Sequence, residues 1–327
     1  MRTLWDVLFP SLRRATIHTT QQCDYLPFLD RHHARMLENL DLGESIKLDH
    51  FLAPASLKTL RLQCSPLIAS LLPSRSSLRT LTELSIFGSS GALLPDSIHL
   101  PLLDSLTVAL EDPRSFLAAI VTPRLTYFNY MQPPKEDLCW STVFADLEEK
   151  FSNVQHLCLK TPENSPLYTN TSADGAFAIC AAFPGVRHAE MDAYEFISFC
   201  WAEEEGSSKA IADRWMHLEH LSLEQCGCWI PDSFVKWLGD RQVEGRPTLQ
   251  VTLFNFDTKG KPNCPWMISL YNSLHEYCLL EMHDVPLTLH LTVRPSDSVI
   301  YGNPPIPGML ASAISTEFAR ATIEMDL

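Results

Sequence analysis

The stretch VQHLCL (residues 154–159) returns in altered form as VRHAEM (186–191) and LEHLSL (218–223), at intervals of 32 residues. Each copy has apolar residues at its first, fourth and sixth positions and a histidine at its third. Side chains alternate between the two faces of a β-strand, so the fourth and sixth positions share one face and the third and fifth share the other. The stretch therefore predicts a short strand with one apolar face, repeated at a fixed interval.

The same pattern, L-x-x-L-x-L with Val, Ile, Ala, Met or aromatic replacements, recurs along most of the chain. Nine copies begin at Leu12, Leu37, Leu57, Leu81, Leu103, Leu125, Val154, Val186 and Leu218. Two looser copies begin at Leu249 and Leu287. One such strand cannot bury its apolar face alone, whereas strands stacked in parallel on their neighbours enclose a continuous core. The series therefore predicts a solenoid of about nine to eleven leucine-rich repeats.

The segments between these strands predict helices that cover the outer face of the sheet. Apolar spacing, capping residues or a leading proline mark candidates at residues 65–72, 113–121, 137–151, 172–183, 231–240, 265–284 and 308–323. Ser172 is expected to cap one of these helices, and Gly239 is expected to end another. Right-handed crossovers from strand through helix to the next parallel strand then give an open arc. A closed barrel of eight parallel strands competes with this layout, but gaps of 20–24 residues leave little room for its helices.

We therefore expect an α/β fold, an irregular leucine-rich-repeat solenoid with a parallel sheet on its concave side and helices on its convex side. Residues 1–300 are expected to form the repeat domain, and residues 301–327 to cap its open end. The arc is expected to be irregular because an Asn or Cys at the ninth position, which satisfies backbone groups in the descending turn, occurs only at Cys226.

Composition and charge limit the kinds of partner. The net charge is −14, and residues 1–80 hold ten Lys and Arg against seven Asp and Glu, so the excess of acid lies in the rest of the chain. A surface this acidic repels phosphate backbones and disfavours nucleic-acid binding. It suits a protein partner with a basic surface, although acidity that keeps the protein soluble is the simpler interpretation.

The sequence also bears on location. No stretch of 18 or more apolar residues predicts a membrane span, and the N-terminal residues lack the features of a signal peptide. The ten cysteines are scattered, mostly in apolar contexts, which favours buried, reduced thiols over a disulfide framework. We expect a cytoplasmic or nuclear protein with no membrane contact.

Several segments resemble the leucine-rich region of the F-box-type proteins that are numerous in mushroom-forming fungi. These segments are LWDVLFPSLRRATI (4–17), PFLDRHHARMLENLDL (27–42), residues 78–110 and FPGVRHAEM (183–191). In that family an F-box docks on the Skp adaptor of a cullin-RING ubiquitin ligase, and the repeats select the substrate. The resemblance, over about residues 5–225, therefore implies a substrate receptor. No L-P-x-E-[IL] signature marks an F-box here, so a link to Skp and cullin requires an F-box outside this chain.

The candidate partner-binding residues occupy the third, fifth and seventh positions, which point out from the concave face. Arginines make the early end of this face basic, acidic residues make the later end acidic, and aromatic and methionine side chains supply the apolar contacts that interfaces favour. The candidates are Arg14, Arg61, Phe87, Tyr127, Asn129, Met131, His156, Lys160, His188, Glu190, Asp192, His220 and Glu224.

Three histidines raise the question of chemistry. His156, His188 and His220 hold the third position of consecutive copies, so their imidazoles form a column spaced by about 4.8 Å. Zinc needs ligands that converge, whereas a straight column diverges, so we expect no metal or cofactor. The alternative is a hydrolase-like or metal-dependent enzyme that uses these histidines with Glu190 and Asp192. No nucleophile-elbow, dinucleotide or P-loop motif occurs, and we expect a non-enzymatic interaction module.

Overall fold

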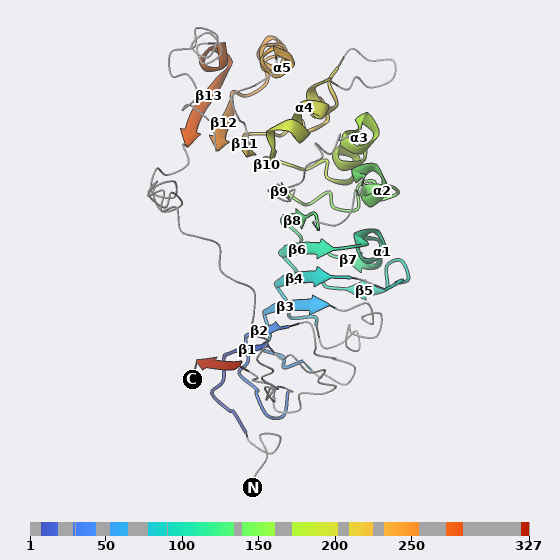
Figure 1. The fold of residues 1–327 in the computed structure, drawn as a ribbon, viewed down its shortest axis with the longest axis vertical. Coiled ribbons are helices and arrows are strands. Elements are labelled where there is room, and N and C mark those ends of the chain that lie inside the picture. The colour runs from blue at the N-terminus through green and yellow to red at the C-terminus, as the bar shows by residue number, and fades with distance from the viewer. Residues whose placement is uncertain are drawn as a thin grey trace, which may run out of the picture.

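The structure, a computed structural model, describes residues 8–18, 29, 31–43, 53–64, 78–89, 91–133, 139–160, 172–201, 209–224, 232–254, 273–283 and 322–326. Among these residues, eleven strands form one parallel sheet in chain order (Figure 1). The strands are β1 (Arg14–His18), β2 (Asn39–Leu42), β3 (Thr59–Cys64), β4 (Glu83–Gly88), β6 (Ser105–Leu110), β8 (Tyr127–Met131), β9 (His156–Lys160), β10 (His188–Asp192), β11 (His220–Glu224), β12 (Leu249–Phe254) and β13 (Cys278–His283). The nine strands that the clear copies predict are confirmed.

Hydrogen bonds keep the copies of the pattern in register. The carbonyl oxygen at the second position of one copy accepts hydrogen bonds from the N–H groups at the second and third positions of the next. Asp104, for example, accepts from Thr126 and Tyr127, each at 3.0 Å. This arrangement occurs eight times in succession, from Arg13 to Arg187. The third positions of neighbouring strands therefore face each other, and each pattern position forms a continuous row across the sheet.

The core lies behind the sheet. From β1 to β12, side chains at the fourth and sixth positions by register are at most 4% exposed, whereas third and fifth positions are partly or fully exposed, apart from Cys158. Four phenylalanines fill the space between the sheet and the outer elements. They are Phe128, Phe144, Phe151 and Phe183, with ring centroids 4.9–6.4 Å apart in the contacting pairs. Each buried aromatic or leucine contributes about 1.5–3 kcal/mol, so the alternation itself holds the strands together.

The strands curve into an arc, and the described helices lie on its outer side (Figure 1). These helices are α1 (Pro113–Ala119), α2 (Trp140–Phe144), α3 (Ala173–Ala182), α4 (Ala193–Trp201), α5 (Asp232–Val243) and the 3₁₀ helix η4 (Ile211–Arg214). A second, two-stranded parallel sheet pairs β5 (Ile98–His99) with β7 (Ile120–Val121). The chain therefore has a solenoid-like α/β fold. No helix in the described part of the chain is long and apolar enough to cross a membrane.

The helix predictions succeed unevenly. Ser172 caps α3 as expected, since its hydroxyl accepts a hydrogen bond from the Gly175 N–H at 3.2 Å. Helix α5 does not end at Gly239 but continues to Val243. The helix expected over 137–151 is confined in the described residues to α2, because Asp146 and Glu149 adopt left-handed backbone angles, with φ of 59° and 55°.

The C-terminal predictions need larger corrections. Residues 278–283, expected in a long helix over 265–284, form β13, and only residues 273–277 of that segment are described as helical. Register with β11 shifts the copy expected at Leu249 by one residue, because His220 pairs with Gln250. Residues 322–323, expected to end a capping helix, instead begin β14 (Thr322–Asp326), which pairs antiparallel with β1. The segments 65–72 and 287–292 and Cys226 lie outside the described residues.

Candidate functional site

The third-position row on the concave face carries four rings in succession. The Tyr127 and His156 ring centroids are 4.9 Å apart, those of His156 and His188 are 5.6 Å apart, and those of His188 and His220 are 4.4 Å apart. Both imidazole pairs meet nearly at right angles. The column of three imidazoles that the 32-residue interval predicts therefore exists on β9 to β11, and the Tyr127 ring extends it to β8.

A charged network runs beside this column. Lys160 Nζ lies 2.8 Å from Glu190 Oε1 and 3.2 Å from Glu224 Oε1. Partial burial alone would raise the pKa of Glu190. The hydrogen bond from Lys160 and its positive charge outweigh this effect and hold the pKa of Glu190 below its ordinary value. Burial lowers the pKa of Lys160, but the carboxylates of Glu190 and Glu224 outweigh this effect and raise it above its ordinary value. The network is therefore charged at neutral pH, with one cation shared by two anions.

Two imidazoles of the column are neutral at physiological pH. Burial lowers the pKa of His156, and the nearby carboxylate of Glu190, 4.0 Å from Nε2, offsets this only in part. Burial also lowers the pKa of His188, and the neighbouring His220 and His156 add to the effect. Neutral imidazole keeps a lone pair on one nitrogen, so these rings act as hydrogen-bond acceptors or metal ligands and not as cations.

Two residues on β9 and β10 are less available than their pattern positions predict. Cys158 lies in register with Glu190, but its side chain is buried, and burial raises the pKa of its thiol to about 12. It is therefore protonated and a poor nucleophile. Asp192 is also buried, and its Oδ1 accepts a hydrogen bond from the Tyr194 N–H at 2.9 Å, at the start of α4. The expectation that Asp192 extends the acidic end of the open face is wrong.

The early end of the face forms a separate group. The Arg61 guanidinium lies over the Phe87 ring, 4.7 Å from its centroid, and its Nε is 3.9 Å from the carboxylate of Asp41. Arg14 is exposed on β1. Serine and threonine on β6 separate this group from the later one. The basic character expected at the early end is thus partly neutralised.

The remaining candidates lie on β8 at the centre of the arc. Met131 is 38% exposed at the end of the strand. Asn129 is half-buried, and its Oδ1 has no hydrogen-bond partner among the described residues. Together with Tyr127 they place an apolar and amide surface next to the histidine column.

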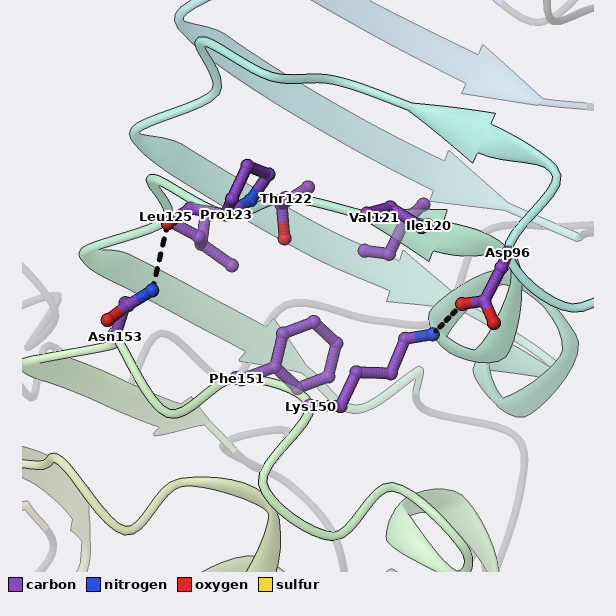
Figure 2. Close-up of a pocket in the computed structure, with 9 residues that line it drawn as sticks. All are labelled: Asp96, Ile120, Val121, Thr122, Pro123, Leu125, Lys150, Phe151 and Asn153. Carbon is purple, nitrogen blue, oxygen red and sulfur yellow. Dashed lines mark hydrogen bonds and ion pairs between the residues drawn. The ribbon is translucent and has the colours of Figure 1, made fainter.

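Three hollows lie away from the candidate residues. Their volumes are about 140, 580 and 490 Å³, and none of the candidate residues lines them. Figure 2 shows the smallest, where Lys150 reaches Asp96 at 2.8 Å and the Asn153 side chain donates to the Pro123 carbonyl at 2.8 Å. The Asn153 contact joins the loops of two neighbouring copies, and the Lys150 contact joins the loops of two copies separated by a third. The concave candidates, apart from the buried Asp192, instead lie on the partly exposed face of the sheet.

Sequence reasoning missed the second positions of the pattern. Arg187 Nη1 lies 3.1 Å from Glu219 Oε1, and one ligand atom from each of His188, Glu219 and His220 lies within 4.8 Å of the others. The signal was present in the sequence, since opposite charges occupy the same position in consecutive copies. Arg13, Glu38 and Lys58 repeat this arrangement at the early end, with contacts of 3.8 and 3.4 Å.

Comparison with models of protein families, with curated proteins and with solved structures finds no match for the chain. The case for a function therefore rests on the geometry of the concave face.

Proposed function

We propose that the parallel strands are degenerate leucine-rich repeats whose concave face binds a protein partner. The observation that carries this proposal is the alternation of buried fourth and sixth positions with exposed third and fifth positions from β1 to β12, which only the buried Cys158 interrupts. Ten intervals of about 4.8 Å and strands of about 16 Å give an open face of roughly 770 Å². A stable protein interface buries about 800 Å² on each partner, so the area of this face is comparable with that of one such interface.

The chemistry of the face supports a binding role over catalysis. Enzyme sites are typically cavities of about 300–1,000 Å³ with converging reactive groups. Two hollows of that size lie among the described residues, and other residues line them. On the face itself Cys158 stays protonated, Glu190 is paired with Lys160, and Asp192 binds the start of α4. Tyr127 and Met131 instead offer the partly exposed rings and thioether that protein interfaces favour.

The substrate-receptor role implied by the resemblance to F-box-type proteins is a specific form of this proposal. In that form the concave face holds the substrate, and an F-box outside this chain supplies the contact with Skp and cullin. Binding of a partner by the concave face and contact with Skp and cullin can be tested separately, because the substrate and the ligase would bind different parts of the assembly.

Cross-linked affinity capture from the native cells tests the proposal with two matched double variants. Tyr127→Ser with Met131→Ser alters the concave face, and Leu94→Ser with Met216→Ser removes exposed apolar side chains elsewhere. We expect the concave variant to lose at least one partner by more than about tenfold, and the control variant to retain it. Equal recovery by both variants and the unaltered chain would refute the binding face. Loss of a partner with Skp and cullin still recovered supports the receptor role, whereas absence of Skp and cullin throughout removes it.

A further inference from the structure

Two histidines and a glutamate converge where β10 and β11 lie side by side. His188 pairs with His220 in the parallel register, and their ring centroids are 4.4 Å apart with planes at 87°. Glu219 precedes His220, and one ligand atom from each of the three residues lies within 4.8 Å of the others. We propose that His188, His220 and Glu219 bind one divalent transition-metal ion of the zinc class.

The donor set and its spacing fit such an ion. Imidazole nitrogen and carboxylate oxygen bind Zn²⁺ at about 2.0–2.2 Å, which places tetrahedral ligands about 3.4 Å apart. The ligand atoms therefore need to approach one another by at most about 1.4 Å, a shift that partly exposed side chains make by rotation about their χ angles. Three protein ligands leave a fourth position for water or for a group of a bound partner.

The imidazoles are available for this role. Neither the His188 nor the His220 side chain forms a hydrogen bond with another described residue. His188 is also neutral at physiological pH, because burial and the adjacent imidazoles lower its pKa. Metal binding therefore does not have to displace a proton from this ring.

The Arg187–Glu219 ion pair weakens the site but leaves a ligand atom for the ion. Arg187 contacts Oε1 of Glu219, while Oε2 has no partner among the described residues and can ligate. Both side chains are close to half exposed. In water, a single positive charge about 4 Å from a doubly charged ion weakens its binding by roughly thirtyfold, which lowers the affinity of a site with three ligands but does not abolish it. Arg187 also fixes the orientation of the carboxylate, as outer-shell partners of metal ligands commonly do.

His156 does not belong to the site, although it shares the column. Its ring centroid is 5.6 Å from that of His188, and its Nε2 lies 4.0 Å from Glu190, which the cation of Lys160 already neutralises. A straight column of imidazoles does diverge. The convergence arises because Glu219 enters from the second position, outside the column.

Metal titration of the full chain tests the proposal. Co²⁺ is followed by its visible spectrum, and Zn²⁺ by competition with a chromophoric chelator, for the unaltered chain and for His188→Asn, His220→Asn, Glu219→Gln and the matched control His156→Asn. We expect one ion bound without the thiolate charge-transfer band that cysteine ligands give. Each of the first three changes should weaken binding at least about tenfold, and the control should shift it less than about twofold.

Thermal unfolding supplies an independent readout. Zn²⁺ should raise the Tm of the unaltered chain and of His156→Asn, because an ion that binds the folded state stabilises it, and His188→Asn should lose most of this rise. A thiolate band, undiminished binding in the His188, His220 and Glu219 variants, equal weakening by His156→Asn, or no binding by the unaltered chain would each overturn the site. The titration needs no partner, so its failure leaves the proposed binding face standing.

Discussion

Lys160 on the concave face forms ion pairs with the carboxylates of both Glu190 and Glu224. Such an arrangement makes the stability of β9 to β11 depend on pH. Because the folded pKa of Glu190 is below its ordinary value of 4.5, the pair stabilises the folded state above that pH and loses this contribution as the pH falls through the folded pKa.

Replacement of Lys160 tests this dependence. We expect Lys160→Met to lower the free energy of unfolding by about 0.5–1 kcal/mol at pH 7, because two carboxylates are left facing each other on a partly exposed surface. The deficit should shrink as the pH falls toward 3 and Glu190 becomes protonated. Urea unfolding at both pH values measures it. Adding Glu224→Gln should recover part of the loss at pH 7, and a deficit independent of pH would contradict the assignment.

The cysteines should differ sharply in reactivity. Cys139 is exposed, and although partial burial opposes the shift, hydrogen bonds with the Ser141 and Ser172 hydroxyls lower its pKa. Burial raises the pKa of Cys158 to about 12 and that of Cys278 to about 11. Iodoacetamide at pH 7.5 should therefore modify Cys139 at least about tenfold faster than the other two. Mass spectrometry of the labelled peptides measures the rates, with urea-unfolded chain as the control in which the difference should vanish.

At the scale of single elements, strands were predictable and helices only in part. The alternation that defines a strand such as β11 is local, and its fourth and sixth positions can be identified without knowing the neighbours. The short run CLLEMH at 278–283 fits the period of a helix and that of a strand equally well. It forms a strand because it pairs with β12. Asp192, which the pattern assigns to the concave row, instead accepts a hydrogen bond from the Tyr194 N–H in the first turn of α4.

The candidate site also has one part that the sequence predicts and one part that it does not. The histidine column follows from a period of two along each strand and from strand register, so the sequence predicts it. The approach of Glu219 to His188 depends on side-chain rotation at a second position, which no periodicity specifies.

Two glycines should respond to alanine in opposite directions. A Cβ at Gly185, in the turn before β10, would lie 2.3 Å from the Ser152 carbonyl oxygen, whereas one at Gly239 in α5 would meet Tyr277 at an ordinary 3.6 Å. Gly185→Ala should lower the free energy of unfolding by about 1–3 kcal/mol through overpacking. Gly239→Ala should raise it by up to about 1 kcal/mol through helix propensity. Urea unfolding gives both values, and shifts of the same sign would contradict the described packing.

For the whole molecule, the stacking of each strand on its neighbours in the chain predicts local effects of core mutations. Leu84 on β4 and Leu221 on β11 are both fully buried. Replacement of either by alanine should cost about 2–5 kcal/mol. Hydrogen exchange should accelerate mainly in β3 to β6 for Leu84→Ala, and mainly in β10 to β12 for Leu221→Ala. Equal acceleration throughout the sheet in both variants would show that the arc unfolds as one unit.

The register of the sheet is independent of the spacing along the chain. Asn39 and Thr59 are paired across 20 residues, and His188 and His220 across 32, yet both pairs hold the same pattern position. Insertions between strands therefore leave every row intact, whereas one residue inserted within a strand exchanges its buried and solvent-facing sets. Descendants of such a chain are free to lengthen its connections while they change the open face one side chain at a time.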